Sequence, residues 1–348
     1  MQKKPTRVCY LNIVGSDFSR SGVHMRALQL KGVQILSCID TSPGARKFWE
    51  LYKKHRALKE EYDVVIVGYP AYILVPFARF VSRKPVLFDA GWSLYEGTVI
   101  ARGLYAHNPL RRFYYWFLDW IACRSATLVL LESNCQIDYY TRLLRTNSSK
   151  CRRLFTGVDE SQFYADPICK KRTAFTVVFR GYSNPEAGLS QILEVARALE
   201  DDEVQFLIIS PNFKPEERLP ANVELRHGFF DIGIVRGWMQ ECHVSLGQMS
   251  TNERLERTIP HKAFESMLLQ IPFMTSDVAG VRELFDDKSA VLVQRGSEIN
   301  MVEQLKRLKG DPDRCARIAE NALKTYTEKC SNAVLAEELM GYIRSVLK

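Results

Sequence analysis

Residues 173–210 read TAFTVVFRGYSNPEAGLSQILEVARALEDDEVQFLIIS. The stretch begins and ends with apolar runs, 173–180 and 204–210, and helix-forming residues fill 189–200 between them. Runs that are apolar on both faces are typical of parallel strands buried between helices. The stretch therefore predicts a strand, a crossover helix and a second parallel strand, which is the repeating unit of a doubly wound α/β sheet.

The same alternation runs through the rest of the chain. On the N-terminal side we expect strands at 7–14, 33–38, 64–68, 85–89 and 126–132, with helices at 21–30 and 48–59. On the C-terminal side we expect strands at 223–227, 244–246, 273–276 and 290–293, with helices at 233–241, 260–270 and 299–308. The remaining residues, 311–348, have a helical pattern throughout.

The two series are separated by a segment between Gly157 and Thr173. This segment contains Pro167 and the charged run 170–172, as linkers often do. At 348 residues the chain has room for about two domains. We predict Rossmann-like domains at 1–160 and 161–330 and a C-terminal helix, 331–348, that packs back on the first. Ligands of open α/β sheets bind beyond the carboxyl ends of the strands, so we expect the two domains to face a cleft.

Composition excludes several classes of protein. With 46% hydrophobic and 25% charged residues, the chain is neither disordered nor collagen-like. The net charge of +8 suits an anionic ligand, an anionic membrane surface or nucleic acid, and a lysine-rich surface explains it equally well. A nucleic-acid partner is not expected, because no basic arm or nucleic-acid motif accompanies the charge.

Motifs for resident cofactors and metals are missing from the sequence. No strand is followed by GxGxxG, and neither GxxxxGK[ST] nor HExxH occurs. The nine cysteines form no CxxC pair, so we expect reduced thiols and a cytoplasmic protein. Asp311-Pro312-Asp313 resembles a DxD metal motif, but Asp before Pro is a common helix start. We therefore expect no cofactor and no metal, and we find no signal peptide or membrane span.

The strongest local pattern is RTIPHKAFESMLLQIPFMTSD at 257–277. Pro260 is expected to begin a helix whose free N–H groups can hold an anion such as a diphosphate. Lys262 and Glu265 lie three residues apart on one face. Lys262 would add positive charge, and Glu265 can accept hydrogen bonds from two ribose hydroxyls. The spacing alone favours a surface helix with an ordinary ion pair.

This block and several shorter pieces together resemble family 4 glycosyltransferases, which have the GT-B fold. The pieces in the second half are FRG at 179–181, HG at 227–228, VSLG at 244–247, IPHKAFE at 259–265 and VREL at 281–284. The first half contributes YDVVIVG at 62–68, PVLFDAGWS at 85–93, ATLVLLES at 126–133 and FTGVD at 155–159. The resemblance covers nearly the whole chain in the right order, and the Pro-x-Lys-x-x-Glu block is its most specific part.

The resemblance implies a retaining transfer of a sugar from a nucleotide sugar to a hydroxyl of a saccharide or glycolipid, without a metal. It assigns donor binding to Gly22, Gly181, His227, Gly228, Pro260 and Glu265. Glu265 would bind the ribose, and Arg180 and Lys262 would neutralise the diphosphate in a catalytic role. The leaving phosphate oxygen would itself accept the acceptor's proton, so the protein mainly stabilises charge and positions the substrates.

Residues that follow strands in the first half are candidates for the acceptor side. Asp89 ends a strand, where it can orient or deprotonate an acceptor hydroxyl, or instead cap a loop with Ser93. Arg20 follows the first strand and can contact a phosphate or the acceptor. With Ser93 and Ser133 it makes up the predicted acceptor site, and Asp89 is added to the catalytic set.

Departures from the family pattern keep two other functions open. Arg257 stands where many members have a first Glu, although Glu253 or Glu256 can substitute if the loop is shifted. Tyr182 and Ala187 replace the usual Arg and Lys of the phosphate-binding loop. The alternatives are a non-catalytic relative that binds a sugar nucleotide or saccharide, and an epimerase-type GT-B enzyme.

Residues 111–120, RRFYYWFLDW, are basic and aromatic. They suit either a membrane interface, where they would meet a lipid-linked acceptor, or a helix whose aromatics lie in the core. The pattern favours the core. Together with the positive charge, it leaves room for peripheral contact with the inner face of a membrane.

Overall fold

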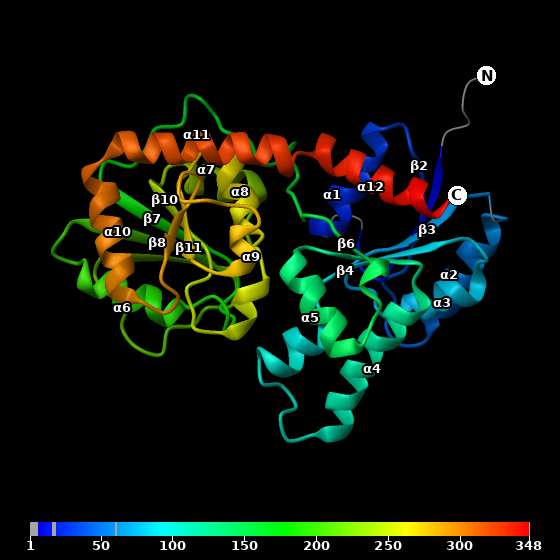
Figure 1. Cartoon of the computed structure of the whole chain (residues 1–348). Helices are drawn as coiled ribbons and strands as arrows, with labels where there is room; N and C mark the ends of the chain where they lie inside the picture. Colours follow the sequence, from blue (N-terminus) through cyan, green and yellow to red (C-terminus); the bar gives the residue numbers. More distant parts are fainter. Residues whose placement is uncertain (1–5, 16–18, 60, 348) are drawn as a thin grey trace. The chain divides into compact units, whose positions relative to one another are not determined.

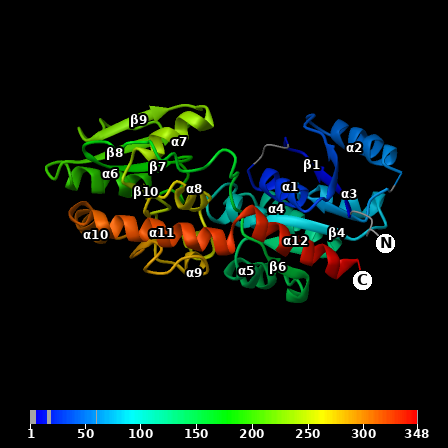
Figure 2. The ribbon, with the colours of Figure 1, turned by 90° about the horizontal axis from the view of Figure 1, so that it is seen from above.

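The computed structural model describes residues 6–15, 19–59 and 61–347. These fall into two compact units, one running up to Asp159 and resuming at Ser331, the other spanning Glu160–Cys330. Both are α/β units with a parallel sheet (Figures 1 and 2). The predicted doubly wound α/β class is confirmed in each unit.

The described part of the first unit contains a six-stranded parallel sheet in the order β2-β1-β3-β4-β5-β6. Its strands are β1 (Arg7–Asn12), β2 (Gln34–Ile39), β3 (Val64–Val67), β4 (Val86–Gly91), β5 (Leu128–Leu131) and β6 (Cys151–Arg153). Its helices are α1 (Ser19–Leu30), α2 (Arg46–Ala57), α3 (Leu74–Val81), α4 (Pro109–Ser125), α5 (Asn134–Leu144) and α12 (Asn332–Val346), with short turns η1 (Glu96–Ile100) and η2 (Ser148–Lys150).

The central strands of this sheet are apolar because helices cover both faces. Every residue of β3, β4 and β5 is buried, in agreement with the unbroken Val and Leu runs that predicted them. The strand order reverses between β1 and β3, and such a reversal is where ligands of open α/β sheets bind. Asn12 closes β1 at this point and donates from Nδ2 to Ser21 Oγ at 3.1 Å.

The C-terminal helix α12 packs within the first unit, beside α1 and β6 (Figure 1). Glu338 on α12 pairs with Arg153 at 3.0 Å, and the Tyr342 hydroxyl donates to the Arg153 carbonyl at 2.7 Å. Lys31 also forms an ion pair with Glu337. These polar contacts fix the end of the chain against the edge of the first sheet.

The described part of the second unit contains a parallel sheet in the order β12-β11-β10-β7-β8-β9. Its strands are β7 (Phe175–Arg180), β8 (Val204–Ser210), β9 (Val223–His227), β10 (Val244–Leu246), β11 (Phe273–Ser276) and β12 (Val291–Val293). Its helices are α6 (Leu189–Ala198), α7 (Ile232–Gln240), α8 (Lys262–Leu268), α9 (Ala279–Arg282), α10 (Glu298–Gly310) and α11 (Pro312–Lys329), with the short turn η3 (Glu253–Arg257). The strand order reverses between β7 and β10.

Several element boundaries differ from the prediction. Helix α8 begins at Lys262, two residues after Pro260, and β1 ends at Asn12 instead of residue 14. Helix α3 was not among the expected helices. Pro76 lies in the first turn of α3, where a missing N–H costs no hydrogen bond.

Three smaller expectations can be compared directly with the structure. Asp311 caps α11, since its side chain accepts a hydrogen bond from the Arg314 N–H at 2.8 Å. The nine cysteines are free thiols. Within the described ranges, no helix combines the length and apolar character that crossing a membrane requires.

Candidate functional site

The best-defined candidate site lies at the strand-order reversal of the second unit. Strand β7 ends at Arg180 and is followed by Gly181, and the neighbouring β10 is followed by Gly247. Gly181 has a φ of +148°, and a Cβ there would lie 3.4 Å from Lys262 Nζ. The fold therefore requires a glycine at this point and brings the end of β7 close to the start of α8.

Glu265 is the central residue of this site. It is buried on α8, and its Oε1 forms an ion pair with Arg180 and accepts from His261 Nδ1 at 3.1 Å. Its other oxygen, Oε2, is buried and has no hydrogen-bond partner among the described residues. Burial acts to raise the pKa of Glu265, but Arg180 and His261 outweigh it and lower the pKa to about 2. An ionised carboxylate thus offers a free acceptor to a ligand.

His261 contributes a second free polar atom beside this carboxylate. Nδ1 contacts the ionised carboxylate, which leaves Nε2 as the second polar atom of the ring. Nε2 is buried and, in the part of the chain described, also lacks a partner. The sequence-based prediction missed His261 as a site residue, although its position four residues before Glu265 puts both on one face of a helix.

Lys262 lies on the turn before Glu265. Its ammonium group donates to the Gly247 carbonyl at 3.3 Å and lies 3.6 Å from the centre of the Phe179 ring. Desolvation lowers the pKa of Lys262 to about 7, with Arg180 acting in the same direction and Glu265 against it. Near neutral pH, a nearby anion would therefore favour the charged form of Lys262.

The start of α8 differs from the predicted anion site. The N–H groups of Ala263 and Phe264 donate to the carbonyls of Pro260 and His261, at 2.8 and 3.1 Å. These two donors are used within the turn and are not free for a diphosphate. The positive charge at this site comes instead from Arg180 and Lys262.

The first unit brings the predicted residues Arg20 and Asp89 together. Asp89 is buried on β4, where it accepts from Arg20 Nε at 2.7 Å and from His24 Nδ1 at 3.0 Å. Arg20 also donates to Thr156 Oγ1 at 2.7 Å and to the Leu154 carbonyl at 3.0 Å. Burial acts to raise the pKa of Asp89, but Arg20 and His24 lower it below its ordinary value.

This arrangement does not favour the expected role of Asp89, which was to orient or deprotonate an acceptor hydroxyl. Both of its oxygens are engaged and its pKa is lowered, so it is a weak base that acts through Arg20 and His24. The alternative of a loop cap shared with Ser93 is wrong, since the partner of Ser93 Oγ is Asp119, at 2.7 Å. Gly22 lies buried within α1, beside the residues of this network in the sequence.

Ser93 and Ser133 belong to a second buried network. Ser93 Oγ accepts from the Glu96 N–H at 2.9 Å, and Ser133 Oγ accepts from the Gln136 N–H at 3.0 Å as the cap of α5. Gln136 Nε2 then donates to Glu96 Oε2 at 3.0 Å and links the two turns. Both serines therefore hold the loops after β4 and β5 in place.

Known proteins are similar in sequence to parts of this chain. A family model described as glycosyl transferase-like matches residues 189–341. The α-D-kanosaminyltransferase of Streptomyces kanamyceticus is 22% identical over 302 residues, which are 81% of this chain and 72% of that protein. Together with the fold, these matches support a GT-B glycosyltransferase of the family 4 type.

Two solved structures show the same fold. HepE of Anabaena, solved in complex with UDP-glucose, superposes with a TM-score of 0.72 at 14% identity, covering 97% of this chain and 99% of that one. Sucrose-phosphate synthase of Thermosynechococcus elongatus superposes with a TM-score of 0.75 at 12% identity, covering 98% of each chain. At these identities the likeness supports the fold of the glycosyltransferase and not its substrates.

An exposed aromatic pair extends the site of this glycosyltransferase toward β9. His227 ends β9 and is exposed, and Gly228 follows with a φ of +131°. Tyr182 and Phe229 come directly after Gly181 and Gly228, with ring centres 6.4 Å apart at 66° and both rings exposed. The repeated glycine–aromatic step after two strands was the signal in the sequence that could have predicted this pair.

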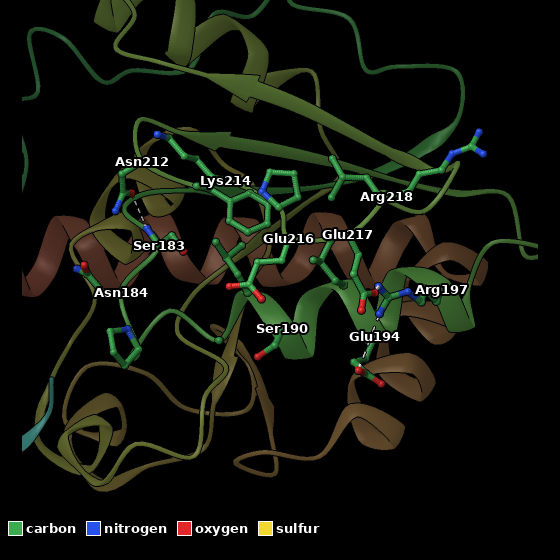
Figure 3. A pocket seen from close by; sticks show the side chains of 17 residues that line it. Ser183, Asn184, Ser190, Glu194, Arg197, Asn212, Lys214, Glu216, Glu217 and Arg218 are labelled. Atoms are coloured by element: carbon green, nitrogen blue, oxygen red, sulfur yellow. Dashed lines mark hydrogen bonds and ion pairs between the residues drawn. The ribbon is translucent and has the colours of Figure 1, made fainter. Parts of the chain in front are cut away.

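A pocket of about 580 Å³ begins next to this pair, between the loop after β7 and the loop after β8 (Figure 3). At one end Asn212 Oδ1 accepts from the Ser183 N–H at 2.8 Å. At the other end Arg197 pairs with Glu217 at 3.4 Å and approaches Glu194 (Figure 3). The mixed charges and exposed rim suit a polar ligand, but none of the predicted site residues lines it.

The glycosyltransferase also departs from the family at η3. Arg257 is half-buried there, and Glu256 forms an ion pair with Arg295 at 2.7 Å. Arg254 is buried and pairs with Glu186 at 3.1 Å, which ties η3 to the loop after β7. Glu256 is therefore already paired. Arg254 stabilises the loop after β7, in which Tyr182 differs from the family.

Proposed function

We propose that this glycosyltransferase moves a sugar from a nucleotide-sugar donor to a hydroxyl group of a saccharide or glycolipid, with retention of the anomeric configuration. The observation that carries the proposal is the buried Oε2 of Glu265, which has no partner within the described residues. Leaving a buried carboxylate oxygen unpaired is costly, so such an atom indicates a hydroxyl donor from a ligand. The UDP-glucose complex of the structurally similar HepE supports a nucleotide sugar as the donor.

The donor-side roles follow from the charges at the site. Glu265 would accept hydrogen bonds from the ribose hydroxyls, while Arg180 and Lys262 would neutralise the diphosphate. As the bond between sugar and phosphate breaks, negative charge grows on the departing diphosphate, and fixed cations stabilise it. The proposal keeps Gly22, Gly181, His227, Gly228 and Pro260 as further donor contacts.

We also propose that the nucleotide sugar is a co-substrate and that the enzyme uses no resident cofactor or metal. Arg180 and Lys262 provide the positive charge that the leaving diphosphate needs. Addition of a chelator is then expected to leave the rate of transfer unchanged, and a rate that depends on an added divalent cation would contradict this part of the proposal.

The acceptor side is proposed to lie on the first unit. Arg20 is held by Asp89, Thr156 and the Leu154 carbonyl, so it is a rigid cation at the end of β1 and β4. In this arrangement Asp89 positions Arg20 and His24, and Ser93 and Ser133 support the surrounding loops. If the acceptor is lipid-linked, the enzyme would work in peripheral contact with the inner face of a membrane.

One observation favours a second candidate function. Arg257 replaces a family Glu, and the nearby Glu256 is paired with Arg295. A relative without this carboxylate can still bind a sugar nucleotide through Glu265 while having lost transfer. This candidate predicts nucleotide binding without turnover.

The test is a panel of UDP, GDP, ADP, CMP and dTDP in thermal-shift measurements on wild type and Glu265→Gln, with the exposed Glu303→Gln on α10 as the matched control. A ligand that binds the native state alone raises its melting temperature. A shift for one nucleotide that Glu265→Gln loses and Glu303→Gln keeps supports the donor site. No shift with any nucleotide would overturn the proposal.

Turnover then separates the two candidate functions. The wild type is incubated with the sugar conjugate of the nucleotide that bound, with and without saccharide or glycolipid acceptors. Transfer with an unchanged anomeric configuration, read from proton NMR couplings, supports the retaining enzyme. Conversion of the donor without any acceptor favours the epimerase type, and binding without any conversion favours the non-catalytic relative.

A further inference from the structure

The outer end of helix α4 exposes a row of apolar side chains. Leu110, Phe113, Tyr114 and Phe117 are 81%, 60%, 50% and 38% exposed. Their spacing, i, i+3, i+4 and i+7, puts all of them on one face of the helix. In a globular protein a face of this kind normally packs against the core, and here it faces outward.

The loop before α4 continues the same exposed surface. Ile100, Leu104 and Tyr105 are also exposed. Tyr105 stacks on Tyr115 with ring centres 5.6 Å apart, and the Arg111 guanidinium lies 4.8 Å from the centre of the Tyr105 ring. Figure 1 shows this end of α4 and its loop extending away from the sheet of the first unit. We call residues 100, 104, 105, 110, 113, 114 and 117 the α4 tip surface.

The α4 tip surface has a defined shape. Asn108 caps α4 by accepting from the Arg111 N–H at 3.0 Å, and Pro109 follows at the first helical position. Arg112 donates to the Ala106 carbonyl at 3.1 Å and ties the loop to the helix. The apolar side chains are therefore displayed by an ordered turn and helix.

The sequence prediction that the aromatics of 111–120 lie in the core is correct for only part of the helix. Trp116 and Trp120 pack against the core of the first unit, and Asp119, Ala122 and Cys123 of the same helix are buried. Phe113 and Phe117 lie beside these tryptophans, with ring centres 5.9 Å from Trp116 and 5.6 Å from Trp120, but they are exposed. Aromatic residues on two neighbouring faces of one helix look alike in sequence, so the pattern alone did not distinguish them.

The segment that forms the α4 tip surface contains arginines and no acidic residue. Residues 97–118 contain Arg102, Arg111 and Arg112 and no Asp or Glu. The acidic residues that flank this range, Glu96 and Asp119, are buried. Apolar and aromatic side chains with arginines beside them match the interface of a bilayer, where rings sit among the headgroups and cations meet lipid phosphates.

We propose that the α4 tip surface docks on a lipid bilayer that contains anionic lipids. Leu110, Phe113 and Phe117 would enter the interface, and Arg111 and Arg112 would face the headgroups. The inference rests on the proposed function in one respect, which is that the enzyme would meet a lipid-linked acceptor at this surface. Binding to a bilayer needs no donor and no turnover, so it is measured independently of that function.

The test is co-sedimentation of the full chain with vesicles of phosphatidylcholine, with and without phosphatidylglycerol. The variants are Leu110→Ser with Phe113→Ser, Arg111→Gln with Arg112→Gln, and Ile299→Ser on α10 as a control that removes an equally exposed apolar residue elsewhere. Wild type and Ile299→Ser are expected to bind the anionic vesicles. The apolar double variant should bind them at least tenfold more weakly, and the arginine variant should lose the preference for anionic lipid.

Two results would overturn the proposal. One is equal sedimentation of the wild type with and without vesicles, or equal binding by the wild type and the apolar double variant. The other is self-association of the wild type, seen by light scattering and abolished in the apolar double variant, which would assign the α4 tip surface to a second copy of the chain. Melting temperature and nucleotide binding are measured on the same variants. If both are unchanged, neither result can be attributed to a folding defect or to a failure of the donor site.

Discussion

Arg180 at the end of β7 and Glu265 on α8 form an ion pair between residues 85 positions apart in the chain. The pair occupies one carboxylate oxygen and leaves the other buried and unpartnered among the described residues. If both carboxylate oxygens of Glu265 had partners, the pair would only link β7 to α8. A half-satisfied one at the strand-order reversal of an α/β sheet indicates a ligand contact.

Replacing Glu265 tests this contact directly. We expect Glu265→Ala and Glu265→Gln to weaken binding of the preferred nucleoside diphosphate at least tenfold, which corresponds to about 1.4 kcal/mol. The reason is the loss of the charged acceptor for the ribose hydroxyls. Isothermal titration of both variants, with Glu303→Gln as the control, measures the change. Unchanged affinity in a folded Glu265→Gln variant would show that the free oxygen does not meet the nucleotide.

Lys262 predicts a pH dependence of donor binding. Its pKa is about 7 in the free protein, and a bound diphosphate is expected to raise it because an anion favours the charged ammonium. The complex then holds more protons than the free protein above pH 7. Affinity is therefore greatest below pH 7 and falls, by up to about tenfold per pH unit, as pH rises from 7 toward the pKa of the complex.

The measurement for Lys262 is titration calorimetry at pH 8 in buffers of different ionisation enthalpy, which reports proton uptake on binding. Lys262→Met should abolish the uptake and flatten the pH profile between 7 and 9. Release of protons by the wild type, or the same profile in Lys262→Met, would contradict the assignment.

Gly181 is expected to resist substitution. A side chain at its φ of +148° is strained, and its Cβ would come into contact with Lys262 Nζ at 3.4 Å. Gly181→Ala should lower the free energy of unfolding by roughly 1–3 kcal/mol and weaken nucleotide binding. Gly341→Ala is the control, because a Cβ there meets nothing within 4 Å inside α12 and should be neutral or stabilising. Chemical denaturation compares the two, and equal stabilities would refute the strain argument.

Asp89 is expected to matter first for stability. Asp89→Asn leaves Arg20 and His24 buried without their counter-charge, and breaking a buried pair costs about 3–5 kcal/mol. Because its pKa is lowered in the folded state, the stabilisation by Asp89 is present above the ordinary carboxyl pKa of about 4 and is lost as pH falls below it. Urea unfolding of Asp89→Asn and of the exposed Asp313→Asn at several pH values checks this. A wild type and an Asp89→Asn variant of equal stability at pH 7 would contradict it.

The fold could be predicted from the sequence because its signals are local. Runs such as Val64–Val67 and Val204–Ser210 are apolar on both faces, and each is long enough for one buried strand. Local spacing also put Lys262 and Glu265 on one face of a helix, but it favoured an ordinary ion pair, and their place in the donor site came from the family resemblance. The partner of Glu265 could not, because Arg180 meets it only after the sheet has formed.

Contacts between residues far apart in the sequence also explain what the prediction missed in both units. His24 joins Asp89 from 65 residues away, and Tyr182 meets Phe229 across the gap between two strands. No periodicity connects such positions, so packing alone decides their pairing. The outward face of α4 was missed for a different reason, since residues on neighbouring helix faces have the same aromatic character.

Tyr182 and Phe229 lead to the last prediction, on the base of the nucleotide. Exposed rings beside a donor site offer a stacking surface, and stacking of a base on an aromatic ring contributes about 1–3 kcal/mol. Phe229→Ala and Tyr182→Ala should therefore weaken binding of the nucleoside diphosphate by about tenfold or more and leave binding of inorganic pyrophosphate unchanged. Ile234→Ala, an exposed apolar residue on α7, is the control. Equal losses for nucleotide and pyrophosphate would assign the rings to the shape of the phosphate loop, and no loss for either would remove them from the site.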